Sequence, residues 1–491
     1  MASITTKAPA IKVRRSVKKG LFSCFSPLFW LTFLFTGLAL LQLGLVNNNL
    51  GLQTFLPLVV LVLCSGTTIY LLQIRFGTVQ ANDPILLPLV FFLCGLGLAL
   101  IARLAPAFVS RQLFWLVMAT ALLLFVTLVP RNLNWLRRYK YTWLIGGLLL
   151  LASTLIFGVN PSGFGARLWL RVGDFFFQPS ELLKLLLVVF LAAYLADRRR
   201  ELVEVRAYIG RVPIPHPAYL GPMLLMWGFS VVLLIWQRDL GAALLFFGTF
   251  LGMLFAATGQ ARYIWAGLLL LAAAGIIGYY LFDVVRLRVD GFLNPWLDPS
   301  GRSFQIVQSL LAFASGGVFG QGLGQGLPTA IPVVHTDFVY AAIGEEYGLL
   351  GALAVLISFA LLFGRAFHIA LRAKGGFEQL LAVGIGTMLG LQTLVITAGT
   401  LKLMPLTGVT LPFVSYGGSS LITSFLMVGL LFAIARGQPA GQFSLAALRT
   451  GPYLRLARAM LVAFLVVAGG LILWQVVLAP FLVRRDDNPR T

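Results

Sequence analysis

The feature that most constrains this chain is a succession of apolar runs, each close to 20 residues long. A helix needs about 20 apolar residues to cross a bilayer, and its backbone polar groups must be paired within the segment. The runs therefore predict thirteen transmembrane helices, at 27–47, 54–74, 84–104, 112–130, 142–159, 180–196, 219–237, 240–257, 263–282, 339–363, 378–401, 419–435 and 457–479.

Composition supports the same class. The 491 residues are 59% hydrophobic and 11% charged, shares that exclude a soluble globular protein and predict an all-α polytopic membrane protein. The net charge of +21 does not indicate nucleic-acid binding, because the lysines and arginines are spread through short loops. Cys24, Cys64 and Cys94 have no paired spacing, so we expect neither a disulfide nor a metal cluster.

Loop charges predict the topology. The basic tail 1–26 and most of the other basic loops fall on one side if the N-terminus is cytoplasmic, as the positive-inside rule requires. The loops 283–338 and 403–418 then lie on the outer face. The C-terminal LVRRDDNPRT is an exception, since it would place three arginines outside.

The stretch from Ser303 to Glu346 is the longest polar-bearing interruption, and a loop of this length is a candidate working site. Its residues 304–313 have helical spacing and predict a short amphipathic helix along the membrane interface. The glycines of 316–326 follow no strand and precede no Gly-Lys-Ser/Thr, so they do not form a nucleotide loop. They permit tight turns instead.

Asp337 is the central candidate of this stretch, at the point where the outer loop meets the next apolar segment. A carboxylate near apolar surface has a raised pKa and suits a general base. Aspartate and threonine are also favoured helix caps, so a capping role for Thr336 or Asp337 is the alternative. For Glu345 and Glu346 the simplest interpretation is pairing with a basic residue on a neighbouring helix.

Glu181 and Lys184 are three residues apart and share a helix face. They form either a self-neutralising pair that lets the helix insert or the lining of a polar cavity.

Arg167 and Arg171 stand beside tryptophan in an outer loop, which suits either a pyrophosphate or ordinary interfacial anchoring. Arg238 and Asp239 form either a surface pair, with the aspartate starting a helix, or part of a site. Lys402 lies in an outer segment broken by prolines and glycines, which predicts a re-entrant loop facing the long one.

Five ordered blocks carry a family resemblance: GARLWLRVGDFFFQPSELLKL, QRDLG, NPWLDPSGRSFQIVQSLLAFASGGVFGQGLGQG, HTDFVYAAIGEEYGLLG and LMPLTGVTLPFVSYGGSS. Together they resemble the SEDS family of RodA, FtsW and SpoVE, with a slight lean to the RodA branch. The resemblance implies a ten-helix core at 84–436 with the large extracellular loop 283–338. The helices in 27–83, and the linker, helix and tail of 437–491, are additions to that pattern.

The family pattern implies a peptidoglycan glycosyltransferase that polymerises lipid II at the outer face of the bacterial cytoplasmic membrane, in cell elongation or division. The family's essential aspartate corresponds to Asp337, and its Glu and Lys to Glu181 and Lys184. One departure is the sequence Pro332-Val333-Val334, where the family usually carries a glutamate.

The implied reaction is inverting: a carboxylate takes a sugar hydroxyl proton while cations hold the leaving pyrophosphate. This makes Asp337 the base, with Arg167, Arg171, Lys184 and Lys402 as pyrophosphate ligands. A divalent cation could share the pyrophosphate charge, but the sequence offers no ligand set for a metal.

The partner implied by resemblance is a class B penicillin-binding protein, a transpeptidase. Two other functions stay open: a flippase for lipid-linked precursors, and a non-catalytic cell-wall scaffold.

Overall fold

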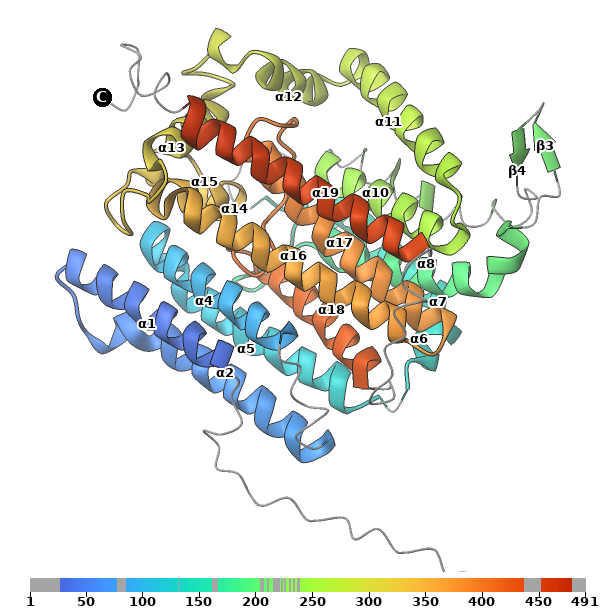
Figure 1. Cartoon of the computed structure of the whole chain (residues 1–491), viewed down its shortest axis with the longest axis horizontal. Helices are drawn as coiled ribbons and strands as arrows, with labels where there is room; N and C mark the ends of the chain where they lie inside the picture. Colours follow the sequence, from blue (N-terminus) through green and yellow to red (C-terminus); the bar gives the residue numbers. More distant parts are fainter. Residues whose placement is uncertain are drawn as a thin grey trace, which may run out of the picture.

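The computed structural model describes residues 27–76, 85–130, 132–160, 167–203, 207–209, 212–214, 239–436 and 452–478, with a few isolated residues between 221 and 235. The chain is helical almost throughout these ranges (Figure 1). The long helices are α1 (Pro27–Val46), α2 (Leu52–Phe76), α4 (Leu86–Leu104), α5 (Val109–Leu128), α7 (Lys140–Phe157), α8 (Pro179–Val203), α10 (Leu240–Thr258), α11 (Ala261–Leu281), α16 (Gly348–Arg372), α17 (Gly376–Thr400), α18 (Gly418–Arg436) and α19 (Pro452–Ile472).

Short elements join them. The short helices are α6 (Asn134–Arg138), α12 (Asp283–Leu293), α13 (Phe304–Gly316), α14 (Val334–Asp337) and α15 (Val339–Glu346), and a π-helical turn, Leu473–Leu478, follows α19. Three-residue 3₁₀ turns occupy Pro106–Phe108, Pro295–Leu297 and Pro328–Ala330. Two antiparallel hairpins pair β1 (Leu170–Val172) with β2 (Phe175–Phe177), and β3 (Ala207–Ile209) with β4 (Val212–Ile214).

Within the described residues, 12 helices are long and apolar enough to cross a membrane. They match twelve of the thirteen predicted spans. The remaining prediction, 219–237, lies mostly outside the described residues, as does the C-terminal LVRRDDNPRT. The helix predicted at 339–363 is wrong at its start, because Gly348 adopts a left-handed φ of 66° that separates α15 from α16.

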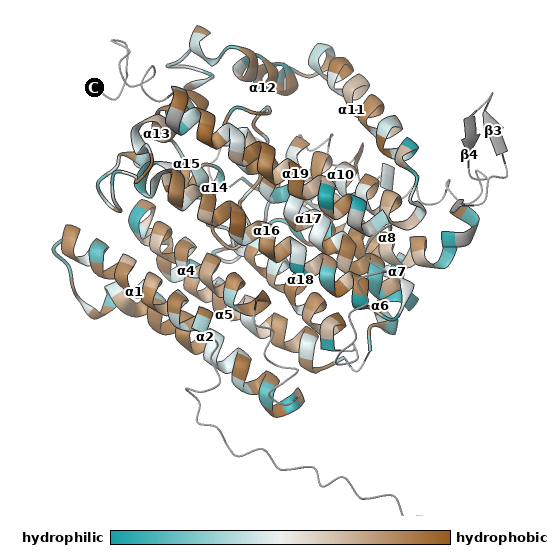
Figure 2. Ribbon diagram, in the orientation of Figure 1, coloured by the Kyte–Doolittle hydropathy of each residue, from teal (hydrophilic) through white to brown (hydrophobic). Residues whose placement is uncertain are grey.

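Burial separates interior from rim. In the apolar part of each span, 89% of the α17 residues and 83% of the α8 residues are buried, but only 11% of those in α11. Figure 1 shows α11 and α12 arching away from the rest of the bundle, and Figure 2 shows hydrophobic residues all along α11. Because its outward face is apolar, α11 suits contact with lipid.

The helix α13 corrects a second expectation. It was predicted to lie along the membrane interface with a wet polar face, but both of its faces are buried. Gln308 and Ser309 are inside, and Ser309 Oγ donates a hydrogen bond of 2.9 Å to the Thr400 carbonyl. The polar positions of α13 can lie inside the bundle because a small polar side chain such as Ser309 donates a hydrogen bond to the end of a neighbouring helix.

Candidate active site

Asp337 lies at a break between two short helices. It is the last residue of α14, and α15 begins at Val339. Two hydrogen bonds from neighbouring residues of another segment fix the break: the Tyr416 amide donates to the His335 carbonyl at 2.9 Å, and the side-chain hydroxyl of Ser415 donates to the Thr336 carbonyl at 2.6 Å. No side-chain cap bond starts α15, so Asp337 does not act as the helix cap considered from the sequence.

The segment 401–417 forms the wall opposite Asp337. It is non-helical for most of its length and partly buried, as predicted for a re-entrant loop. A Cβ placed on Gly97, midway along α4, would lie 2.6 Å from the Val414 carbonyl oxygen. The loop therefore packs against the middle of an apolar helix that is long enough to span a membrane.

Gly408 brings two charged groups together at the tip of this loop. Its φ of 73° is left-handed, and a Cβ built there would lie 3.5 Å from Asp337 Oδ2 and 3.9 Å from Arg288 Nη2. Arg288 comes from α12, and its Nη1 donates to the Thr407 carbonyl at 3.2 Å. The carboxylate and the guanidinium thus flank a glycine turn whose left-handed backbone disfavours any other residue.

The electrostatics of Asp337 favour a proton acceptor. Its side chain is half-buried. Burial raises the pKa of Asp337 to about 6, while a hydrogen bond from Thr336 and attraction to Arg288 oppose the rise and Asp239 adds to it. A carboxyl group with this pKa is ionised at neutral pH and still basic enough to accept a proton.

Asp239 is a second carboxylate facing Arg288. It caps α10 through a 3.1 Å bond from the Ala242 amide to Oδ1, and its Oδ2 accepts from Ser180 Oγ at 3.2 Å. This confirms the helix-starting role considered for Asp239; Arg238 lies outside the described residues. Burial raises the pKa of Asp239, and both Asp239 and Asp337 act on the charge of Arg288.

Glu181 and Lys184 form the buried pair that was one of the two interpretations. Lys184 Nζ lies 2.8 Å from Glu181 Oε1 and 3.2 Å from Gln392 Oε1. Gln392 Nε2 in turn donates to the Thr410 carbonyl at 2.8 Å. The Lys184 ammonium group is therefore held within the bundle and is linked through Gln392 to the 401–417 loop.

The other predicted cations are not brought to Asp337 by any described contact. Arg167 and Arg171 are exposed on the segment that contains the β1–β2 hairpin, and Arg171 Nε donates to the Gly173 carbonyl of its own turn at 2.8 Å. Lys402 has a left-handed φ of 54° at the end of α17, where its backbone amide bonds to the Gly399 carbonyl. Sequence reasoning missed Arg288, because α12 carries two arginines and their spacing alone does not say which turns inward.

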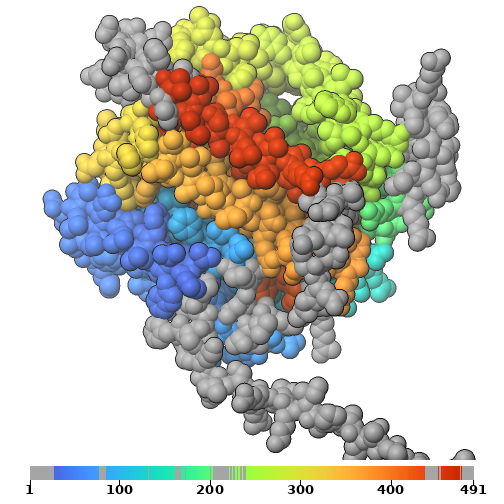
Figure 3. Space-filling view, viewed as in Figure 1, coloured from blue at the N-terminus to red at the C-terminus, as the bar shows by residue number. Residues whose placement is uncertain are grey.

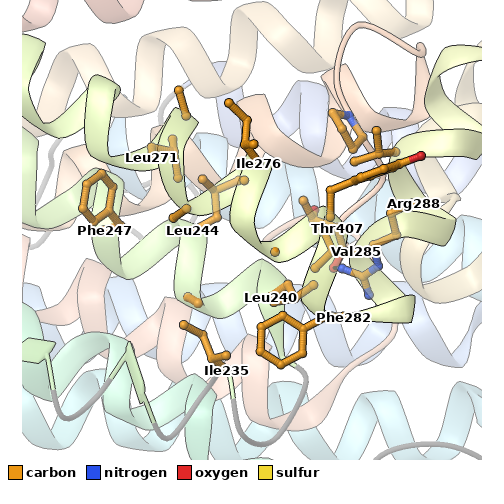
Figure 4. A pocket seen from close by; sticks show the side chains of 18 of the residues that line it. Ile235, Leu240, Leu244, Phe247, Leu271, Ile276, Phe282, Val285, Arg288 and Thr407 are labelled. Carbon is orange, nitrogen blue, oxygen red and sulfur yellow. Dashed lines mark hydrogen bonds between the residues drawn. The ribbon is translucent and has the colours of Figure 1, made fainter.

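An apolar cavity of about 880 Å³ opens beside Arg288. It lies between α10, α11 and α12, and residues 405–407 close one end (Figure 4). Side chains such as Leu244, Phe247, Leu271 and Ile276 line it, and Arg288 sits at its end beside Thr407. The hollow beneath the α11–α12 arch is visible in Figure 3. Its volume falls in the range of ligand pockets.

The carboxylates of Glu345 and Glu346 bind neighbouring groups of the fold. Arg103 Nε pairs with Glu346 Oε1 at 3.1 Å, which confirms the predicted pairing with a neighbouring helix for Glu346. The Gly324 amide donates to the same Glu346 oxygen at 3.2 Å, and the Leu327 amide donates to Glu345 Oε1 at 3.0 Å. The glycine-rich run therefore folds around these two carboxylates.

The departure at Pro332-Val333-Val334 places no charge beside Asp337. Val333 is exposed with a left-handed φ of 55°, and Val334 is buried. Gln305 Nε2 donates to the Pro332 carbonyl at 3.3 Å. Among the described residues no three His, Cys, Asp or Glu side chains gather as metal ligands.

These features define a polytopic membrane protein with a carboxylate–guanidinium site at the end of an apolar cavity. The family model for FtsW, RodA and SpoVE, described as cell cycle proteins, matches residues 85–439. The chain belongs to this family.

Relatives and solved structures agree with that membership. The chain is 37% identical to peptidoglycan glycosyltransferase RodA of Mycobacterium tuberculosis over 72% of its length and 78% of the relative. It is 41% identical to a probable peptidoglycan glycosyltransferase FtsW of Geobacter sulfurreducens, over 61% of this chain and 78% of that one.

Two solved structures resemble the fold. One chain, from a peptidoglycan synthase complex that coordinates polymerization and crosslinking, has a TM-score of 0.59 at 32% identity and covers 72% of this chain and 99% of its own. The rod shape determining protein RodA of Thermus thermophilus has a TM-score of 0.53 at 30% identity, over 72% of this chain and 97% of that one.

Proposed function

We propose that this chain is a peptidoglycan glycosyltransferase that polymerises lipid II into glycan strands. The observation that carries the proposal is that Asp337 and Arg288 flank Gly408, with Arg288 at the end of the apolar cavity. A lipid-linked sugar needs these parts together: a base for the sugar, a cation for the pyrophosphate and an apolar channel for the lipid. The family relatives named as peptidoglycan glycosyltransferases support the same activity.

Asp337 serves as the general base. Its carboxylate takes the proton of the acceptor sugar hydroxyl, and the hydroxyl oxygen forms a bond to the anomeric carbon of the donor. The bond from that carbon to the pyrophosphate oxygen breaks, and its electron pair leaves on the lipid pyrophosphate. Attack opposite the leaving group inverts the anomeric centre in one step.

Arg288 stabilises the charge that develops on the leaving group. Its position at the end of the cavity puts it where the head group of a lipid occupying the cavity would lie. A guanidinium remains charged and can bind a phosphate with two parallel hydrogen bonds. Arg288 therefore replaces Arg167, Arg171, Lys184 and Lys402 as the first choice for the pyrophosphate ligand.

The lipid chain enters from the membrane through the gap beneath α11. That helix contacts the bundle little, and its exposed side chains are apolar, including Leu269, Ile276 and Leu281. A polyprenyl chain is as apolar as the bilayer, so it gains little by leaving lipid and can slide into a groove of matching character. The head group then stays near Arg288.

The site faces the outside of the bacterial cytoplasmic membrane, with the N-terminal tail in the cytoplasm. The charge distribution of the loops supports this orientation. A class B penicillin-binding protein is the proposed partner, since a chain of similar fold works in a complex that couples polymerization to crosslinking. The ten-helix core at 84–436 carries the chemistry, and 27–83 and 437–491 are additions.

The test is polymerisation of labelled lipid II by the purified protein with its partner. Wild type is compared with Asp337→Ala and Asp337→Asn, and with Asp283→Asn as the matched control. Asp283 starts α12 in the same loop and its side chain is 93% exposed. We expect polymer from wild type and the control and none from the Asp337 variants; normal polymer from both Asp337 variants contradicts the proposal.

The same preparations separate the alternatives. A flippase moves labelled lipid II across the membrane of proteoliposomes and forms no polymer. A scaffold binds the transpeptidase and gives neither polymer nor movement. Either result with wild type would replace the glycosyltransferase assignment.

A further inference from the structure

Three aromatic rings gather beside the active site, and one of them belongs to His335, two residues before Asp337. The ring centroids of Phe108 and Tyr416 lie 4.7 Å apart, and these two rings are stacked. The centroid of the His335 ring lies 5.3 Å from that of Phe108 and 5.7 Å from that of Tyr416. They come from three separate elements: the 3₁₀ turn before α5, α14 and the 401–417 loop. All three rings are partly exposed.

This cluster is tied to the catalytic segment by the backbone. His335 precedes Asp337 by two residues, and its carbonyl accepts the 2.9 Å bond from the Tyr416 amide. The 401–417 loop therefore carries both Gly408, which lies beside Asp337, and Tyr416, which belongs to the ring cluster.

Polar groups border the rings. Arg111 hydrogen-bonds the Tyr416 hydroxyl, and the Gly417 amide donates to Gln112 Oε1 at 3.5 Å. Burial lowers the pKa of His335, so its imidazole is neutral at physiological pH. Flat apolar faces with amide and hydroxyl groups at their edges match a pyranose ring, which has C–H groups on its faces and hydroxyl groups at its rim.

We propose that Phe108, His335 and Tyr416 form a carbohydrate subsite for an N-acetylated sugar of the glycan, adjacent to the sugar that reacts at Asp337. The cluster would otherwise be an apolar surface beside a site that handles polar substrates. A fixed ring platform holds the polymer in register while each new unit is added. The inference rests on the proposed function, because it names where the saccharide of that reaction binds.

The test uses tetra-N-acetylchitotetraose and the full-length protein in detergent. Saturation-transfer NMR reports which sugar protons contact the protein, and titration of the tetrasaccharide gives its affinity. We expect the tetrasaccharide to bind wild type, with its ring C–H protons receiving the strongest transfer. Tyr416→Ala and Phe108→Leu should bind about tenfold more weakly, the size expected for losing one aromatic contact.

Tyr416→Phe is the matched control, because it keeps the ring and loses only the hydroxyl. It should bind as wild type within about twofold, and thermal unfolding of both variants checks that each is folded. In the polymerisation assay Tyr416→Ala should give shorter strands and a higher KM for lipid II, with kcat little changed. Equal tetrasaccharide affinity in wild type, Tyr416→Ala and Phe108→Leu overturns the subsite.

Asp337→Asn distinguishes this proposal from the proposed function. It should bind the tetrasaccharide as wild type does while making no polymer. If Asp337→Asn polymerises normally, the base assignment fails and the binding comparison still decides the subsite. If all variants bind equally, the subsite fails and the base assignment stands.

Discussion

Two acidic centres, Asp337 and Glu346, lie nine residues apart in the sequence and are used in opposite ways. Glu346 has no exposed side-chain surface, and one of its oxygens accepts bonds from Arg103 and from the Gly324 amide. Asp337 is half-buried and faces a guanidinium across Gly408. The charge of Glu346 holds a loop in place, whereas Asp337 lies near Arg288, which lines the apolar cavity.

The difference lies in what surrounds each carboxylate. Glycines let the 316–326 run fold closely onto α15: a Cβ on Gly320 would lie 2.3 Å from the Glu346 carbonyl oxygen, and one on Gly316 1.9 Å from that of Gly344. At Asp337 a single glycine leaves space instead of filling it. A carboxylate that binds backbone amides stabilises structure, while one that lies beside a cation with a raised pKa is a candidate for reaction.

The largest expected effect comes from Asp337→Asn. Removing the base should lower the polymerisation rate by about 10²–10⁴-fold. The stability effect has the opposite sign. Because the folded pKa of Asp337 is raised, its ionisation destabilises the folded state as pH rises through about 6, so the neutral amide should raise the unfolding midpoint at pH 7. Differential scanning fluorimetry checks this; a lower midpoint would return Asp337 to a structural role.

Arg288→Gln should have the next largest effect. It removes the cation that we propose for the leaving pyrophosphate and that favours the ionised form of Asp337, and we expect a loss of about 10²-fold in kcat. Its loss should also raise the pKa of Asp337 above about 6. Arg288→Lys keeps the charge but not the planar fork, and should retain more activity. Equal rates for Arg288→Gln and wild type would exclude a role at the pyrophosphate.

The pH profile of wild type provides a third comparison. The base must be ionised, so the polymerisation rate should increase with pH and level off above about 6. Glu346→Gln should leave this midpoint unchanged, since that carboxylate takes no part in the reaction. Steady-state rates between pH 5 and 8 give both curves. A midpoint near pH 4 would mean that burial does not perturb Asp337.

Glu346→Ala should act on stability alone. It leaves Arg103 and the Gly324 amide without their acceptor, which costs about 1–3 kcal/mol for a buried group. We expect a lower unfolding midpoint with a near-normal rate per folded molecule at low temperature. A rate that falls in proportion to Asp337→Asn would place both acidic centres in the reaction.

The membrane spans could be predicted from the sequence, because the length of an apolar run is a local property of the chain. It also placed Asp337 at a loop–helix junction. It did not predict Arg288 or the buried α13, since both depend on which helices become neighbours. The split at Gly348 was hidden because its left-handed backbone follows from contact with the 316–326 run and not from its own neighbours.

The smallest expected effect tests whether the N-terminal helices support the structural centre. Gln42 Nε2 of α1 donates to the Leu323 carbonyl at 3.2 Å, and a Cβ on Gly324 would lie 3.3 Å from Val46. Gln42→Ala should lose about 0.5–1.5 kcal/mol and speed hydrogen exchange of the amides in 322–327. Leu38→Ala, on the exposed side of α1, is the control and should leave that exchange unchanged. Because the loop also binds Glu345 and Glu346, its loosening should reach Asp337 weakly, with polymerisation reduced far less than by the Asp337 and Arg288 variants.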